Sequence, residues 1–217
     1  MAGNGLPRLG SVQPDLEELP VTDPTDELAQ ALDATDRLVA AVEDSDWSAA
    51  TPCSEWTVRQ LVNHVVGGNR VFARILTGGE LPPLAELGRN RGLDVLGDDP
   101  VAAYRESAAG LLSAFRQPGV LERMVDIPIG SVPGIAALQL RIVESLVHGW
   151  DLAQAIGQPL TAPDELAEYA LAFSQARLAD LPPGRTPFGP PQPVAAEASA
   201  IERLVALLGR SVPRGEA

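Results

Sequence analysis

The sequence predicts an all-α protein in which several helices pack into one bundle. Apolar residues recur at helical spacing in successive segments of the chain. One of these segments, residues 141–156, is apolar on nearly every side, which is typical of a helix at the centre of a core. With 217 residues and no internal repeat, the chain suits a single domain with a substantial core.

The N-terminal third is predicted to hold a flexible arm and two helices. Residues 1–24 are acidic and interrupted by Pro and Gly, which predicts a flexible arm ahead of a domain spanning residues 25–212. A first amphipathic helix is expected at residues 26–43. The second, at 57–77, starts with a capping-box pattern at Thr57 and stops at the glycine pair that follows Thr77.

The middle of the chain is predicted to hold one helix and one extended segment. A connection rich in Pro and Gly, residues 81–99, leads to a helix at 100–116, and Pro100 suits its first turn. Residues 120–129 contain apolar residues compatible with a strand, so they form either a short hairpin or a long loop.

The central helix follows, and two further helices complete the predicted bundle. Ser131 and Pro133 are expected to cap and begin the central helix, and Gly157 to end it. A helix at 163–181 and a short closing helix at 198–208 follow, and the proline-rich segment 182–193 between them is irregular.

Charge and composition exclude several classes of protein. The formal net charge of −13 argues against binding to nucleic acid or to anionic membranes. A single cysteine excludes an internal disulfide, and lysine is absent, which removes Schiff-base chemistry and the P-loop. Since no signal peptide or membrane-spanning run is found, we expect a cytoplasmic protein.

The central helix carries the strongest candidate site. Glu144 and His148 lie one turn apart on the same helical face, and a buried carboxylate requires a charged or metal partner. The only other histidine, His64, lies in the second apolar helix. Two imidazoles and a carboxylate can form an open three-ligand metal set. The alternative is a hydrogen-bonded core histidine beside an unrelated ion pair.

Five further residues are candidates around this site, each with a simpler alternative. Asp151 either supports a ligand imidazole or is a solvated charge, and Trp56 either walls the pocket or is a core aromatic. Gly68 provides room for a ligand or for close helix packing. Arg141 binds a substrate carboxylate or, as we favour, forms a surface ion pair. Cys53 is expected to be a small buried apolar residue.

Two segments resemble known metal-ligand motifs. Residues 51–68 (TPCSEWTVRQLVNHVVGG) and 144–153 (ESLVHGWDLA) are similar to those of the DinB-like superfamily, and within it to the mycothiol-dependent maleylpyruvate isomerase N-terminal group. The tail at 198–209 resembles the closing segment of that group. The resemblance spans about residues 26–210 and implies a four-helix bundle with a divalent metal, usually zinc, held by His64, Glu144 and His148.

The resemblance also implies a chemistry. We expect a metal-dependent enzyme that uses a low-molecular-weight thiol such as mycothiol for transfer to, or isomerisation of, a small electrophilic metabolite. The isomerase of the family carries a further C-terminal domain that this sequence lacks, so a thiol-linked activity is expected rather than maleylpyruvate isomerisation itself. The alternative is a metal-containing binding or stress-response module without turnover. Iron also suits two histidines and one carboxylate.

Overall fold

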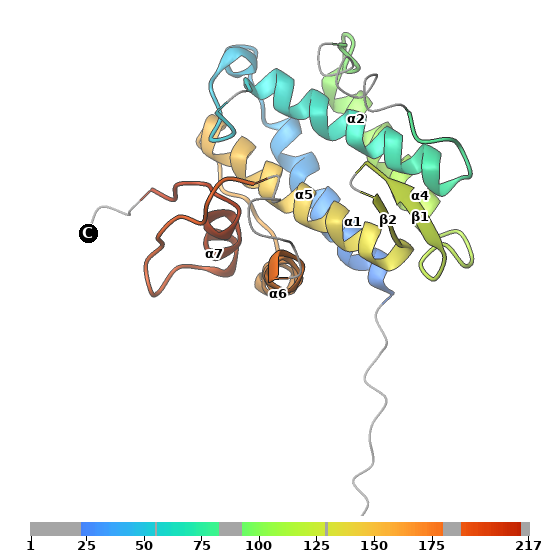
Figure 1. Ribbon diagram of the computed structural model, residues 1–217. Coiled ribbons are helices and arrows are strands. Elements are labelled where there is room, and N and C mark those ends of the chain that lie inside the picture. Colours follow the sequence, from blue (N-terminus) through green and yellow to red (C-terminus); the bar gives the residue numbers. More distant parts are fainter. Residues whose placement is uncertain (1–22, 55, 83–92, 129, 180–187, 214–217) are drawn as a thin grey trace, which may run out of the picture.

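Four helices form the body of the molecule. The computed structural model describes residues 23–54, 56–82, 93–128, 130–179 and 188–213. Its main helices are α1 (Pro24–Ala40), α2 (Val58–Leu76), α4 (Pro100–Phe115) and α5 (Gly134–Ile156). Helices α1 and α2 each pack against both α4 and α5, which closes a four-helix bundle (Figure 1). The predicted all-α, DinB-like fold is confirmed.

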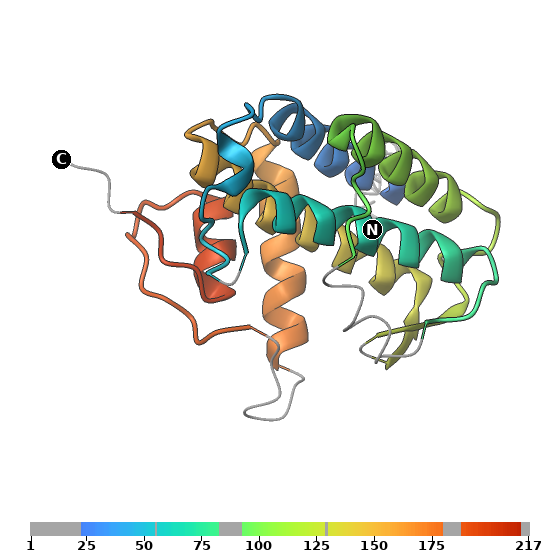
Figure 2. The same cartoon turned by 90° about the horizontal axis from the view of Figure 1, so that it is seen from above.

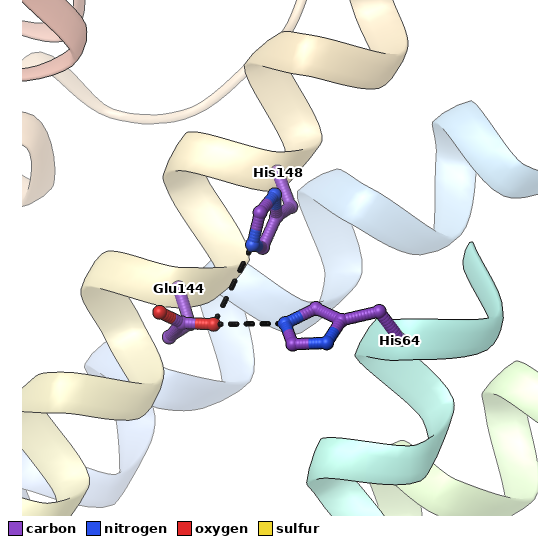
Figure 3. A group of neighbouring side chains, drawn as sticks. All are labelled: His64, Glu144 and His148. Carbon is purple, nitrogen blue, oxygen red and sulfur yellow. Dashed lines mark ion pairs between the residues drawn. The ribbon is translucent and has the colours of Figure 1, made fainter. Parts of the chain in front are cut away.

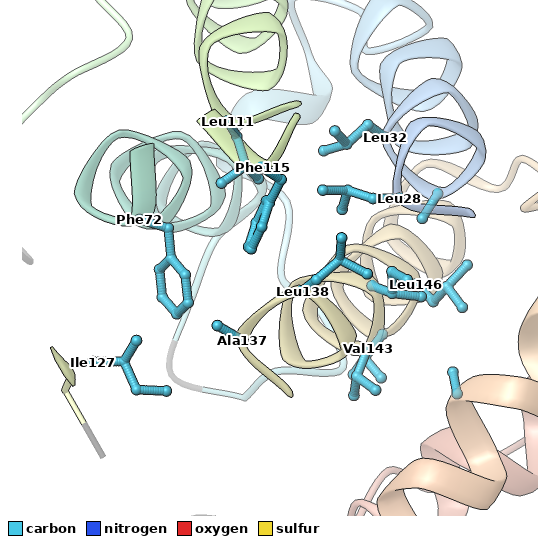
Figure 4. Close-up of a cluster of buried hydrophobic side chains, with 14 of the residues drawn as sticks. Leu28, Leu32, Phe72, Leu111, Phe115, Ile127, Ala137, Leu138, Val143 and Leu146 are labelled. Atoms are coloured by element: carbon cyan, nitrogen blue, oxygen red, sulfur yellow. The ribbon is translucent and has the colours of Figure 1, made fainter. Parts of the chain in front are cut away.

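The central position of α5 follows from its sequence. It is buried on almost every side, as expected for a helix without a polar face. The core around it is built from leucine and phenylalanine side chains of all four helices, which point toward a shared interior (Figure 4). Fully buried examples are Leu28, Leu111 and Leu138, and each contributes about 1.5–3 kcal/mol when it leaves water.

A short antiparallel hairpin covers one end of the bundle. Strand β1 (Met124–Ile127) pairs with β2 (Gly130–Pro133), and the hairpin contacts α2 and α5. The hairpin interpretation is therefore the correct one, although only β1 lies within the predicted segment 120–129 and β2 follows it. The expectation that Ser131 caps the central helix is wrong, because Ser131 lies in β2 opposite Asp126. Helix α5 instead begins directly after the strand, at Gly134.

Two further helices pack on the opposite side of the bundle from the hairpin. Helices α6 (Asp164–Ala179) and α7 (Ala200–Leu207) contact each other and α5 (Figure 1 and Figure 2). The segment between them is described only from residue 188, where it forms no helix or strand up to α7. No helix in the described ranges combines the length and the apolar character of a membrane span.

Local capping explains where the helices begin and end. Asp23 caps α1 through the Thr25 amide, so this helix begins earlier than predicted, and the N-terminal arm otherwise lies outside the described residues. The predicted capping box at Thr57 is present, and Gly157 ends α5 in the left-handed region. A single 3-10 turn, η1 (Asp46–Ser48), lies in the loop before α2.

Candidate metal centre

Two helices bring three ligand-type side chains to one point. His64 extends from α2, and Glu144 and His148 extend from α5 (Figure 3). The Oε2 atom of Glu144 lies 3.5 Å from His64 Nε2 and 3.5 Å from His148 Nε2. One ligand atom from each residue lies within 4.8 Å of the other two. No other group of His, Cys, Asp and Glu side chains in the described residues meets this spacing.

The distances from Glu144 to the two imidazoles fit the ligand spacing around a small divalent cation. In a tetrahedral zinc site with nitrogen and oxygen ligands about 2.0–2.2 Å from the metal, neighbouring donors lie about 3.4 Å apart. His148 is almost fully buried, whereas the side chains of His64 and Glu144 are 36% and 30% exposed. A cation bound here would therefore face solvent on one side, as an open catalytic site requires.

The environment sets the charge of each ligand candidate. Burial opposes ionisation of Glu144, but hydrogen bonds from His148 and His64 and the charge of Arg141 hold the pKa of this carboxyl well below its ordinary value. Burial lowers the pKa of His64. Burial also opposes protonation of His148, but its hydrogen bonds to Asp151 and Glu144 raise its pKa. The anionic Glu144 and the neutral His64 are in the states that metal ligation needs.

Asp151 supports one of the two imidazoles. Its side chain is completely buried, and its Oδ2 lies 3.1 Å from Nδ1 of His148. An ionised carboxylate can only accept, so Nδ1 donates the hydrogen. In the neutral imidazole, Nε2, the nitrogen that faces Glu144, would then offer its lone pair to a metal. The alternative of a solvated helix-end charge is wrong, because Asp151 is fully buried and pairs with Arg210 from the segment after α7.

Arg141 is buried beside the cluster, so the expectation of a surface ion pair is wrong. Its side chain is 4% exposed, and Nη1 lies 3.9 Å from Glu144 Oε2. Nη2 donates to Asn69 Oδ1 at 2.8 Å, and the guanidinium carbon lies 5.0 Å from the ring centroid of Phe72. A Cβ on Gly68 would lie 3.0 Å from Nη1. The missing side chain of Gly68 thus accommodates Arg141, which is close packing rather than room for a ligand.

Trp56 forms a wall of the site. Its ring centroid lies 4.4 Å from that of His64 and 5.7 Å from that of His148. Two hydrogen bonds hold the loop that carries it: the Trp56 amide donates to Cys53 O at 2.9 Å, and its carbonyl accepts from Thr51 Oγ1 at 2.9 Å. Cys53 is half-buried and packs against the apolar cluster beneath, in agreement with an apolar packing role.

Two residues near the site are absent from the sequence-based candidates. Arg210 pairs with Asp151 at 2.9 Å, and Asn69 accepts from Arg141 while donating to Ser107 Oγ at 3.2 Å. Asn69 is completely buried on the face of α2 that carries the buried Val65, Val66 and Phe72, and a polar residue in such a position is the available sequence signal. Arg210 has no such signal, since it follows a helix stop in a segment rich in charge and glycine.

Comparisons with known proteins agree with this architecture. Residues 28–153 match the family described as mycothiol maleylpyruvate isomerase N-terminal domain. Two uncharacterized proteins from two strains of Mycobacterium tuberculosis are each 37% identical over 185 residues, which cover 84% of this chain and 95% of theirs.

Two solved structures share the fold. The crystal structure of the mycothiol-dependent maleylpyruvate isomerase matches with a TM-score of 0.58 at 20% identity, and that of a histidine-to-alanine mutant of the enzyme with 0.61 at 18%. Each match covers 74% of this chain and 70% of the other. On the extent of the family match and the identity to the mycobacterial relatives, the chain belongs to the mycothiol maleylpyruvate isomerase N-terminal domain family.

Proposed function

We propose that this protein is a divalent-metal-dependent enzyme that uses a low-molecular-weight thiol of the mycothiol type, either to transfer it to a small electrophilic metabolite or to isomerise that metabolite. The observation that carries the proposal is the convergence of His64, Glu144 and His148 with one side open to solvent. Family membership supports the thiol, since the solved structures of similar fold are of a mycothiol-dependent isomerase.

The three side chains would hold the metal, and zinc suits a set of two imidazoles and one carboxylate. When bound, the metal would supply Lewis acidity that lowers the pKa of a thiol, so that the thiolate is available at neutral pH. Asp151 keeps the His148 ring in the required orientation and tautomer. The charge of Arg141 keeps Glu144 anionic in a half-buried place. The indole of Trp56 excludes water from one side of His64.

A thiol titration tests the function directly. Cobalt-substituted protein should develop a thiolate-to-cobalt charge-transfer band in the near ultraviolet when mycothiol is added, because a thiolate would occupy the open side of the site. The S-methyl analogue has no thiolate to offer and should produce no such band. If neither compound changes the spectrum at millimolar concentration, the proposal of a thiol-dependent enzyme is wrong. The remaining function is then that of a metal-containing module without turnover.

Removal of the metal should lower stability without unfolding the helices. The bundle has its own apolar core, unlike a zinc finger. A ligand present at 100 times its dissociation constant stabilises the native state by about 2.7 kcal/mol. For a chain of this size, chelation should therefore lower the melting temperature by about 5–11 °C. Far-ultraviolet circular dichroism should stay helical, and the same chelator should leave the melting temperature of His64→Ala unchanged.

A further inference from the structure

The carboxylate of Asp151 is shared between a proposed metal ligand and an arginine from the end of the chain. Its Oδ2 accepts from His148 Nδ1 at 3.1 Å and from Arg210 Nη2 at 2.9 Å, and its Oδ1 lies 3.3 Å from Arg210 Nε. The guanidinium thus contacts both carboxylate oxygens. The Asp151 side chain is completely buried and that of Arg210 is 12% exposed.

The end of α7 places Arg210 at this position. Gly209 adopts a positive φ of 89°, its amide donates to Ala206 O at 3.1 Å, and the Arg210 amide donates to Val205 O at 2.9 Å. This is the hydrogen-bond pattern of a glycine-terminated helix, and it reverses the chain after α7. A Cβ on Gly209 would lie 2.9 Å from Gly189 Cα, so the reversed backbone is packed tightly.

Arg210 restricts the orientation that the Asp151 carboxylate can take. A two-point contact between a planar guanidinium and a carboxylate fixes the plane of the carboxylate as well as its charge. Arg210 is itself held by a third bond, from Nη1 to the Leu208 carbonyl at 3.1 Å. With the carboxylate fixed, Oδ2 stays in place to accept from Nδ1 of His148, and Nε2 stays directed toward Glu144.

We propose that Arg210 is a positioning residue for the metal site, which acts on His148 through Asp151. This inference rests on the metal site of the proposed function and extends it to a residue outside the cluster. It makes the closing segment after α7 part of the metal-binding apparatus, although no side chain of its described residues, up to 213, belongs to the ligand cluster. A competing interpretation is that Arg210 only neutralises a buried carboxylate and so stabilises the fold.

A double-mutant cycle separates positioning from simple stabilisation. Arg210→Gln should weaken zinc binding about 10–100-fold, as typical for loss of a group that supports a metal ligand. Arg203→Gln is the matched control, since Arg203 lies on α7, the helix that precedes Arg210, and pairs with Glu168 on α6 rather than with a residue of the cluster. In an Asp151→Asn background, Arg210→Gln should cause little further loss, because its effect passes through Asp151.

The measurements are zinc affinity by chelator competition and the visible spectrum of cobalt-substituted protein. A change in the cobalt ligand-field bands in Arg210→Gln but not in Arg203→Gln reports altered ligand geometry, which a purely structural role would not produce. Arg210→Lys keeps the charge without the planar fork and should fall between wild type and Arg210→Gln. If Arg210→Gln does not fold, Arg210→Lys alone and with Asp151→Asn takes its place in the cycle.

The possible outcomes distinguish failure of the positioning role of Arg210 from failure of the metal site itself. Wild-type zinc affinity in Arg210→Gln or in Arg210→Lys would overturn the positioning role and leave the proposed function intact. Losses that add in the double variant would also overturn it. A wild-type protein that binds no divalent metal would overturn the metal site itself, and the positioning role with it.

Discussion

Replacement of Glu144 by Gln is expected to lower the affinity for zinc more than about 100-fold. Loss of a group that only supports a metal ligand costs about 10–100-fold, and Glu144 is both a proposed ligand and the one anionic member of the cluster. The amide keeps the shape of the carboxylate without its charge, so the bundle should remain folded. Equilibrium competition with a chelating dye measures the affinity, and elemental analysis measures the metal retained after purification.

A matched variant controls for the loss of negative charge. Glu106 lies on α4 with its side chain 79% exposed and pairs with Arg70, so Glu106→Gln should bind zinc as wild type does. His64→Ala removes a ligand from the other helix and should lose metal as Glu144→Gln does. Equal metal content in Glu144→Gln, Glu106→Gln and His64→Ala would show that the cluster is not the metal site.

Replacement of Gly134 by Ala is expected to be the most destabilising glycine-to-alanine change among the described glycines. A Cβ at this position would lie 1.9 Å from the backbone oxygen of Val120 and 2.8 Å from its carbonyl carbon. Two hydrogen bonds hold the start of α5 against the segment that contains Val120. They run from the Gly134 amide to Arg123 O and from the Ile135 amide to Leu121 O, and each is 2.8 Å long. Relief of the overlap must therefore move backbone and weaken both bonds.

The expected cost lies at or above the upper end of the usual 1–3 kcal/mol for overpacking. For a chain of this length it corresponds to a fall in melting temperature of about 6–12 °C, measured by circular dichroism on the metal-free protein. Gly110→Ala is the control: Gly110 lies within α4 with nothing within 4 Å of its Cβ position. There, alanine should stabilise the helix by about 0.5–1 kcal/mol. A neutral Gly134→Ala would show that the segment before β1, at Val120 and Leu121, does not press on the start of α5.

The helices could be predicted because the chemistry that ends them is local. Thr57 and Gln60 form their capping box within one turn, and Gly157 takes up its left-handed conformation at the helix end whatever packs on it. The hairpin was harder to predict from the sequence, since each strand has only four residues. Ser131, two residues before Pro133, also suits a helix cap. Pairing with β1 decides between these two states of β2, and that pairing depends on tertiary structure.

The candidate site divides in the same way. Glu144 and His148 share a helical face by spacing alone, and the scarcity of histidine singles out His64, so the cluster could be predicted and the structure brings it together. The metal itself stays a prediction. Arg141 could not be placed, because its burial depends on a glycine of another helix. Arg210 lies 59 residues from its partner, beyond the reach of any local pattern.

The division of the ligands between α2 and α5 has a consequence for how the bundle opens. The two contributing positions, His64 and Glu144, are 80 residues apart (144 − 64). Helix α2 packs far more extensively on α4 than on α5, so the cluster lies across the smaller of its interfaces with these two bundle helices. An ion held there would be a reversible cross-link that closes a long loop and thereby restricts the unfolded chain. Separation of α2 from α5 and release of the ion would then be a single event. The lifetime of the bound ion would therefore report how often the interface between α2 and α5 opens.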